Sequence, residues 1–256
     1  MNEFASEYYW IIISSSFFLA GIVKGTLGLG LPTTAITILT FFLPPLDAVM
    51  INVIPVLILN SWQYYQAEDH LFVVRKYWRL AAWMIASLAV FSFVTVHLSS
   101  ELIKLWIGVG ILSFLVTNLR GSGWYIRPEK MRIWQPFVGI ISGFVGGPTV
   151  LWAIPLTIYL IAAKIPKREF VDTMGFLLLV GCMPVLFGYL STEVLVLSEI
   201  WFPSIVATLV ATMGFVIGQS IREKISTDLF RNLLLWMFFI MGMRMIVEAI
   251  LSLIHI

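Results

Sequence analysis

Charged residues are scarce in this sequence. Of its 256 residues only 12% are charged, against about 25% in an ordinary soluble domain, while 60% are hydrophobic. The net charge of +2 is too small to indicate a nucleic-acid partner, and no stretch is polar enough for a separate soluble domain. The composition therefore predicts an integral membrane protein whose surroundings are the lipid bilayer.

Cysteine and histidine are also rare, with one cysteine, Cys182, and three histidines. A single cysteine excludes an internal disulfide and any metal or iron-sulfur site built on cysteine. No cluster of histidine, cysteine and acidic residues falls in the middle of an apolar segment. We therefore predict neither an enzyme nor a metal or other cofactor.

Apolar segments recur along the whole chain, and most are near the about 20 residues that a helix needs to cross a membrane. Five lie on each side of a polar stretch, GSGWYIRPEKMRIW, and the first two of each five are short. At 1.5 Å per residue the first is only about 20 Å long, so the short pairs are interpreted as half-helices. The ten segments are 10–23, 33–43, 46–66, 77–97, 101–119, 134–145, 149–163, 168–190, 199–220 and 230–252.

An internal repeat relates the two sets of segments. GIVKGTLGLGLPTT (21–34) aligns with GIISGFVGGPTV (139–150) if a gap of about two residues is allowed, so that Pro32 falls on Pro148. Farther along, Asn52 falls on Thr173. The pattern predicts an all-α membrane fold with a first repeat at 1–120, a linker at 121–133 and a second repeat at 134–256.

Lysine and arginine indicate the orientation, because they are enriched in cytoplasmic loops. They gather in four connections, whereas the N-terminus, 44–47 and 190–199 have none. We therefore predict an inverted-topology repeat in the cell inner (plasma) membrane, with both termini outside. The basic residues are Arg75, Lys76 and Arg79; Arg120, Arg127, Lys130 and Arg132; Lys164, Lys167 and Arg168; and Arg222, Lys224 and Arg231.

The two glycine-rich breaks are candidate anion sites near the middle of the membrane. Irregular backbone is tolerated there only where it is buried in protein or lines a cavity. Pro32 and Pro148 are each expected to begin a helix, whose N-terminal N–H groups and partial positive charge favour an anion. The candidate binding residues are Lys24, Gly25, Gly28, Gly30, Thr33 and Asn52 in the first repeat, and Gly143, Gly146, Gly147, Thr149 and Thr173 in the second.

Several of these residues have other interpretations. Glycines four residues apart commonly form helix-packing contacts, which is how we interpret Gly214 and Gly218. Lys24 could be a flanking charge at a membrane surface, and Asn52 could be an interhelical hydrogen-bonding group. Asp172 is the candidate for coupling to protons, because an ionisable group inside a span is a functional candidate.

The sequence resembles the TauE/SafE sulfite exporter family in its length, its two halves and the glycine-rich segment that begins each half. The resemblance implies a transporter of a small sulfur-containing anion, such as sulfite or an organosulfonate, working by alternating access. A passive anion channel of the same build, or a membrane-embedded enzyme or assembly factor, are the alternatives. The anion, the direction, the coupling ion and the oligomeric state are left open by the sequence.

Overall fold

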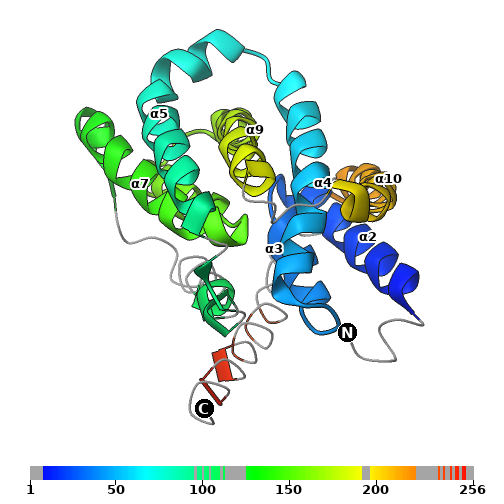
Figure 1. Cartoon of the computed structure of the whole chain (residues 1–256). Coiled ribbons are helices and arrows are strands. Elements are labelled where there is room, and N and C mark those ends of the chain that lie inside the picture. Colours follow the sequence, from blue (N-terminus) through cyan, green and yellow to red (C-terminus); the bar gives the residue numbers. More distant parts are fainter. Residues whose placement is uncertain are drawn as a thin grey trace. The chain divides into compact units, whose positions relative to one another are not determined.

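A computed structural model of the chain describes residues 8–94, 97–99, 101–103, 105–109, 112, 125–191 and 197–222, and a few single positions between 236 and 251. Every regular element named in this part of the chain is helical (Figure 1). The elements are α2 (Tyr9–Leu27), α3 (Leu31–Leu39), α4 (Pro45–Tyr65), α5 (His70–Val94), the 3₁₀ helix η2 (Pro128–Lys130), α7 (Met131–Thr149), α8 (Ala153–Ala162), α9 (Lys167–Ser191) and α10 (Leu197–Arg222).

Five of these helices are long and apolar enough to cross a membrane, namely α2, α4, α5, α9 and α10, and α8 is a shorter apolar helix. An all-helical membrane protein is therefore confirmed. Eight of the ten expected segments correspond to described helices. The segments expected at 101–119 and 230–252 lie largely outside the described residues.

Several of the expected boundaries were wrong. The largest difference is at α5, which begins at His70 and not at residue 77, so Arg75, Lys76 and Arg79 lie in a helix rather than in a connection. The first short segment continues to Leu27, giving a helix of 19 residues, so Lys24 and Gly25 lie in a helix rather than in a break. Pro148 does not begin a helix. It lies next to the last residue of α7, and α8 begins only at Ala153. By contrast, Pro32 does lie in the first turn of α3, as expected.

The chain forms two compact units that take helices from both halves of the sequence. Unit 1 comprises Met1–Pro55, Leu98–Leu115 and Val196–Ile256, and it holds α2, α3, the first half of α4, and α10. Unit 2 comprises Val56–His97 and Val116–Leu195, and it holds the rest of α4, α5, α7, α8 and α9. The repeats expected at 1–120 and 134–256 stay a prediction. The spatial units do not follow these boundaries, because α5 from the first half lies in unit 2 and α10 from the second half lies in unit 1. We refer to this as the exchange of α5 and α10.

In unit 1, α2 packs along α10 through small residues. A methyl group at Gly25 would lie 2.9 Å from Gly218 Cα, and Gly21 lies against the backbone of Ala211. Thr26 Oγ1 donates to Gly218 O at 3.1 Å. These close approaches match the small-residue packing of membrane helices, where backbones must come near each other. The packing interpretation of Gly218 is confirmed.

In unit 2, α7 packs along α5 in the same manner. A methyl group at Gly139 would lie 2.8 Å from Met84 N, and one at Gly147 would lie 2.6 Å from Phe91 Cβ. Ser87 Oγ adds a hydrogen bond to Ile140 O at 2.8 Å. Close contacts at glycine therefore hold α2 against α10 in unit 1 and α7 against α5 in unit 2.

The starts of the first three helices relate the two halves without a gap. The first residues of α2 and α7 are 9 and 131, those of α3 and α8 are 31 and 153, and those of α4 and α9 are 45 and 167, in each case 122 positions apart. This register places GIVKG (21–25) on GFVGG (143–147). Lys24 then corresponds to Gly146 and not to Ser142, and Gly21 corresponds to Gly143 and not to Gly139. Asn52 and Thr173 remain nearly equivalent, as the eighth and seventh residues of α4 and α9.

Within each unit the connections gather by charge. In unit 1, the Trp10 ring lies 5.2 Å from the Phe202 ring, so the starts of α2 and α10 lie together at one end. In unit 2, Arg168 pairs with Glu68, and Lys164 Nζ lies 5.0 Å from the ring of Tyr125. Three basic connections therefore share one end of unit 2, whereas the inverted topology stays a prediction.

Candidate functional site

The first break consists of Gly28, Leu29 and Gly30, between α2 and α3. Gly28 and Gly30 have φ angles of 79° and 98°, a left-handed conformation that glycine adopts without strain. The N–H of Gly28 donates to Lys24 O at 2.7 Å and closes the last turn of α2. Glycine is therefore favoured here by the backbone turn itself.

Lys24 lies in the last turn of α2 with only 1% of its surface exposed. A cation in the last turn of a helix complements the negative end of the helix dipole, which contributes about 0.3–1 kcal/mol at exposed positions. That term is small beside the several kcal/mol that a desolvated charge costs, so a lysine buried at this place requires an anion, a carboxylate or other strong acceptors. Lys24 therefore remains the candidate charge of unit 1.

The start of α3 supplies further polar groups in unit 1. Thr33 is 3% exposed, and its carbonyl accepts a hydrogen bond from Thr37 Oγ1 at 2.5 Å. The next residue, Thr34, is fully buried, and its Oγ1 has no hydrogen-bond partner among the described residues. Asn52 on α4 is also fully buried. Its Nδ2 donates to Ala48 O at 2.9 Å, while its Oδ1 is unpartnered.

The second break consists of Val150, Leu151 and Trp152, between α7 and α8 in unit 2. Val150 has a φ of 60°, the conformation that Gly28 adopts in the first break. Thr149 Oγ1 donates to Val145 O at 2.6 Å and accepts from the N–H of Leu151 at 3.2 Å. Thr149 therefore closes the end of α7, and its hydroxyl both donates and accepts a hydrogen bond within the protein.

The second-repeat glycines Gly143, Gly146 and Gly147 are all inside α7 and buried. Gly143 lies against Ser87, and Gly147 against Phe91, while the carbonyl of Gly147 accepts from the hydroxyl of Tyr189 at 2.6 Å. Each of them has a packing role in unit 2. Their part in binding stays a prediction.

Trp152 is a candidate that the sequence reasoning missed. It is 1% exposed, its Cβ lies against Gly146, and a methyl group at Gly181 would come within 2.7 Å of its Nε1. The indole N–H has no acceptor among the described residues. An indole nitrogen can only donate, and buried donors are almost always satisfied, so this one requires a ligand or a water as acceptor. The available signal in the sequence is a large aromatic residue just before the apolar run of α8.

Two further hydroxyls of unit 2 are buried without a partner in the described part of the chain, those of Ser142 on α7 and Thr173 on α9. Thr173 lies close to the Tyr77 hydroxyl but makes no hydrogen bond of normal geometry.

Asp172 is half-buried, with Arg168 and His70 as its electrostatic neighbours. No described group of three or more histidine, cysteine, aspartate and glutamate residues could hold a metal ion.

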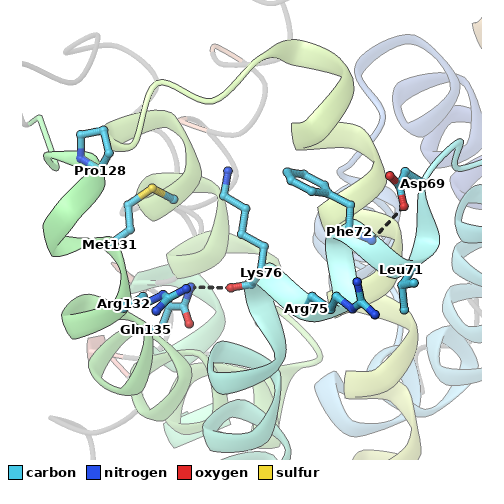
Figure 2. A pocket seen from close by; sticks show the side chains of 9 residues that line it. All are labelled: Asp69, Leu71, Phe72, Arg75, Lys76, Pro128, Met131, Arg132 and Gln135. Carbon is cyan, nitrogen blue, oxygen red and sulfur yellow. Dashed lines mark hydrogen bonds between the residues drawn. The ribbon is translucent and has the colours of Figure 1, made fainter.

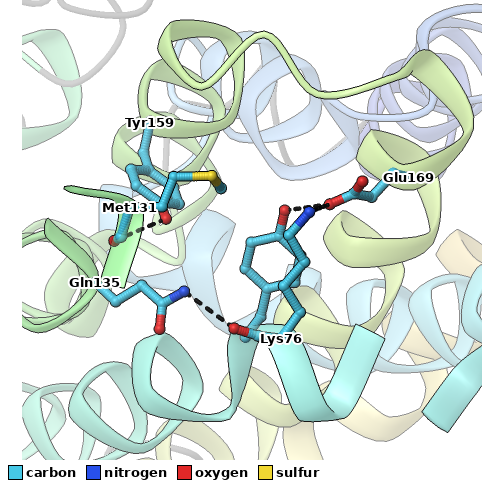
Figure 3. Close-up of polar contacts among 6 residues, drawn as sticks. Lys76, Met131, Gln135, Tyr159 and Glu169 are labelled. Carbon is cyan, nitrogen blue, oxygen red and sulfur yellow. Dashed lines mark hydrogen bonds and ion pairs between the residues drawn. The ribbon is translucent and has the colours of Figure 1, made fainter. Parts of the chain in front are cut away.

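A polar cluster joins four helices of unit 2 (Figure 3). Glu169 on α9 accepts hydrogen bonds at its Oε1 from Lys76 Nζ at 2.6 Å and from the Tyr77 hydroxyl at 2.5 Å. Gln135 on α7 donates to Lys76 O at 3.1 Å, and the Tyr159 hydroxyl on α8 donates to Met131 O at 3.2 Å. The sequence reasoning read Lys76 as a loop residue and did not single out the others, because their partners lie up to 93 positions away.

Comparison with known proteins identifies the chain at the level of family. The sequence model described as Sulfite exporter TauE/SafE matches residues 13–245, nearly the whole chain. No curated protein and no solved structure matches the chain significantly.

Proposed function

Because the chain belongs to the TauE/SafE sulfite exporter family, we propose that it exports a small sulfur oxyanion or organosulfonate by alternating access. The family match carries the proposal, since it indicates a membrane transporter of this type and covers residues 13–245. The finer points, namely the anion, the outward direction and the carrier mechanism, belong to the proposal.

The buried polar groups support an anionic substrate. Four of the unpartnered groups in the described residues can donate a hydrogen bond, namely Thr34, Ser142, Trp152 and Thr173. Hydrogen bonds to a charged acceptor are roughly twice as strong as neutral ones, so an oxyanion satisfies such donors well. We propose that each break contributes donors of this kind from its own unit, with Lys24 adding positive charge in unit 1.

Purified protein tests the substrate class directly. A ligand that binds the folded state stabilises it by RT ln(1 + [L]/Kd), so the melting temperature should rise with sulfite, thiosulfate or a sulfonate but not with a matched chloride salt. In proteoliposomes, saturable flux and counterflow of labelled anion are expected for a carrier. Flux without saturation or counterflow would show a channel, and recovery of an altered anion would show an enzyme.

Lys24 variants test the site in unit 1. Lys24→Arg keeps the charge and Lys24→Gln removes it at similar length. We expect the glutamine variant to lose at least about tenfold in anion affinity, which corresponds to about 1.4 kcal/mol, and the arginine variant to retain most of it. Unchanged affinity in both variants, in protein that inserts normally, would make Lys24 a packing or flanking residue.

Asp172 is the proposed coupling group. If it carries a proton, wild-type transport should depend on pH, and Asp172→Asn should transport at a rate that no longer follows pH. The variants Arg168→Gln and His70→Gln, which alter its two electrostatic neighbours, are expected to shift the pH profile without abolishing it. A pH profile that is flat in both wild type and Asp172→Asn would remove Asp172 from this role.

A further inference from the structure

Unit 2 contains a cavity of about 560 Å³ between the first turns of α5 and α7 (Figure 2). Phe72, Arg75 and Lys76 line it from α5, and Met131, Arg132 and Gln135 line it from α7. Both helices begin beside it, at His70 and Met131, so their positive dipole ends lie near this cavity. The cavity is distinct from the two helix breaks.

The charges around the cavity favour an anion. Three cations line it against one carboxylate, Asp69, whose Oδ1 is engaged by the N–H of Phe72 at 2.8 Å. Lys76 is engaged by Glu169 at 2.6 Å. Arg75 and Arg132 form no ion pair among the described residues and are exposed, so their guanidinium groups are available to a ligand.

Gln135 provides the second, independent observation. Its side chain is 1% exposed and lines the cavity, its Nε2 is engaged by Lys76 O, and its Oε1 has no hydrogen-bond partner in the part of the chain that the structure describes. A buried amide oxygen without a donor is unfavourable, because the hydrogen bonds that it makes to water in the unfolded chain are not replaced. This oxygen is not exposed to the cavity, so a donor on the anion, or a water in its shell, reaches it only if the Gln135 side chain turns toward the cavity.

Topology alone does not account for this arrangement. Positive charges near a loop orient a membrane protein wherever they lie, but they need not surround a cavity or bury an amide beside it. In unit 1, the equivalent place between the starts of α2 and α10 is occupied by Trp10 and Phe202, whose rings are in contact.

We propose that this cavity is a first binding site for the transported anion, which it gathers from water at the basic end of unit 2. The inference rests on the proposed function. One water occupies about 30 Å³ of liquid, so the cavity holds a small oxyanion together with several waters. Such a site raises the local substrate concentration and the encounter rate rather than fixing the anion tightly.

The decisive test is transport by Arg75→Gln/Arg132→Gln, with Arg79→Gln as the control for charge. Arg79 lies one turn along α5, is exposed and does not line the cavity. With labelled sulfite in phosphatidylcholine vesicles at low salt, the double variant should raise KM at least about fivefold with kcat within about twofold, and the difference should shrink once the Debye length falls below about 8 Å. Arg79→Gln should leave KM unchanged.

Other variants keep the test decisive if the double variant does not insert. Gln135→Leu removes the unpartnered oxygen without changing charge, and it should also raise KM. Equal KM in wild type, Arg75→Gln/Arg132→Gln and Gln135→Leu, or an equal rise in Arg79→Gln, would overturn the proposal. If phosphatidylglycerol raises the melting temperature of the wild type but not that of Arg75→Gln/Arg132→Gln, and sulfite raises neither, then the cavity binds a lipid phosphate. That result would likewise overturn the proposal. A wild type that moves no anion would refute the proposed function itself.

Discussion

The carboxylate of Glu169 is the best place to test the polar cluster of unit 2. Its side chain is 13% exposed, and it accepts hydrogen bonds from both Lys76 and Tyr77 across the contact between α5 and α9. Glu169→Gln keeps the shape of the side chain and can still accept from Tyr77, but it leaves Lys76 without its counter-charge. The pair Arg168 and Glu68, also at the start of α9, is a matched comparison because both of its side chains are more than half exposed.

The two pairs should differ clearly in magnitude. Hydrogen bonds to charged groups contribute about 1.5–3 kcal/mol, and the Lys76 side chain, at 33% exposure, loses part of that to solvent screening. We expect Glu169→Gln to lower the free energy of unfolding by about 2 kcal/mol and Glu68→Gln by about 0–1 kcal/mol. For a chain of this size each kcal/mol shifts the melting temperature by about 2–4 °C.

Thermal unfolding in neutral detergent is the assay, followed by intrinsic tryptophan fluorescence. The expected shift is about 4–8 °C for Glu169→Gln and at most about 4 °C for Glu68→Gln. In the cycle of Glu169→Gln with Tyr77→Phe, a coupling energy of about 0.5–3 kcal/mol should appear, because the two groups share one hydrogen bond. Equal shifts in the two glutamine variants, or strict additivity in the cycle, would refute the reasoning.

Three further outcomes are expected. Gly139→Ala should lower the melting temperature, because its methyl group would lie 2.8 Å from Met84 N, and Gly175→Ala, whose nearest atom, Tyr64 N, is at 3.1 Å, should lower it less. A cysteine replacing Arg127 should be labelled from the cytoplasmic side alone, and labelling from outside in sealed cells would contradict the inverted topology. Asn52→Leu and Thr173→Val should each weaken anion binding at least several-fold, and wild-type affinity in both would make them packing residues.

Most of the helices could be predicted from the sequence because each one has to satisfy its own backbone in lipid. A long apolar run such as 168–190 has hardly any other structure available to it, and α9 matches it closely. The ends of α2 and α7 were less predictable. Glycine and proline in these segments predict a break, but Gly25 and Gly143 are tolerated because neighbouring helices pack on them, and Pro148 is tolerated because the helix ends there.

The candidate site was predictable only where one residue carries its own signal. A lysine in an apolar run, such as Lys24, is visible without a structure. The unpartnered indole of Trp152 is not, because its environment depends on Gly146 and Gly181, which belong to two different helices. The contact of Glu169 with Lys76 spans 93 positions and follows from packing alone. Sequence patterns of helix period cannot report contacts of this kind.

The exchange of α5 and α10 between the units separates two roles that the glycines were expected to share. In each unit the G-x-V-x-G stretch, 21–25 in α2 and 143–147 in α7, faces the exchanged helix closely enough to exclude a side chain. Those glycines are needed for packing whether or not an anion binds. The residues after them differ between the units, with Gly28 and Gly30 in one and Val150 and Trp152 in the other, and no packing argument requires that difference. We therefore propose that ligand recognition lies at the breaks themselves and at the first turn of α3, where Trp152 and Thr34 are buried donors without a partner among the described residues.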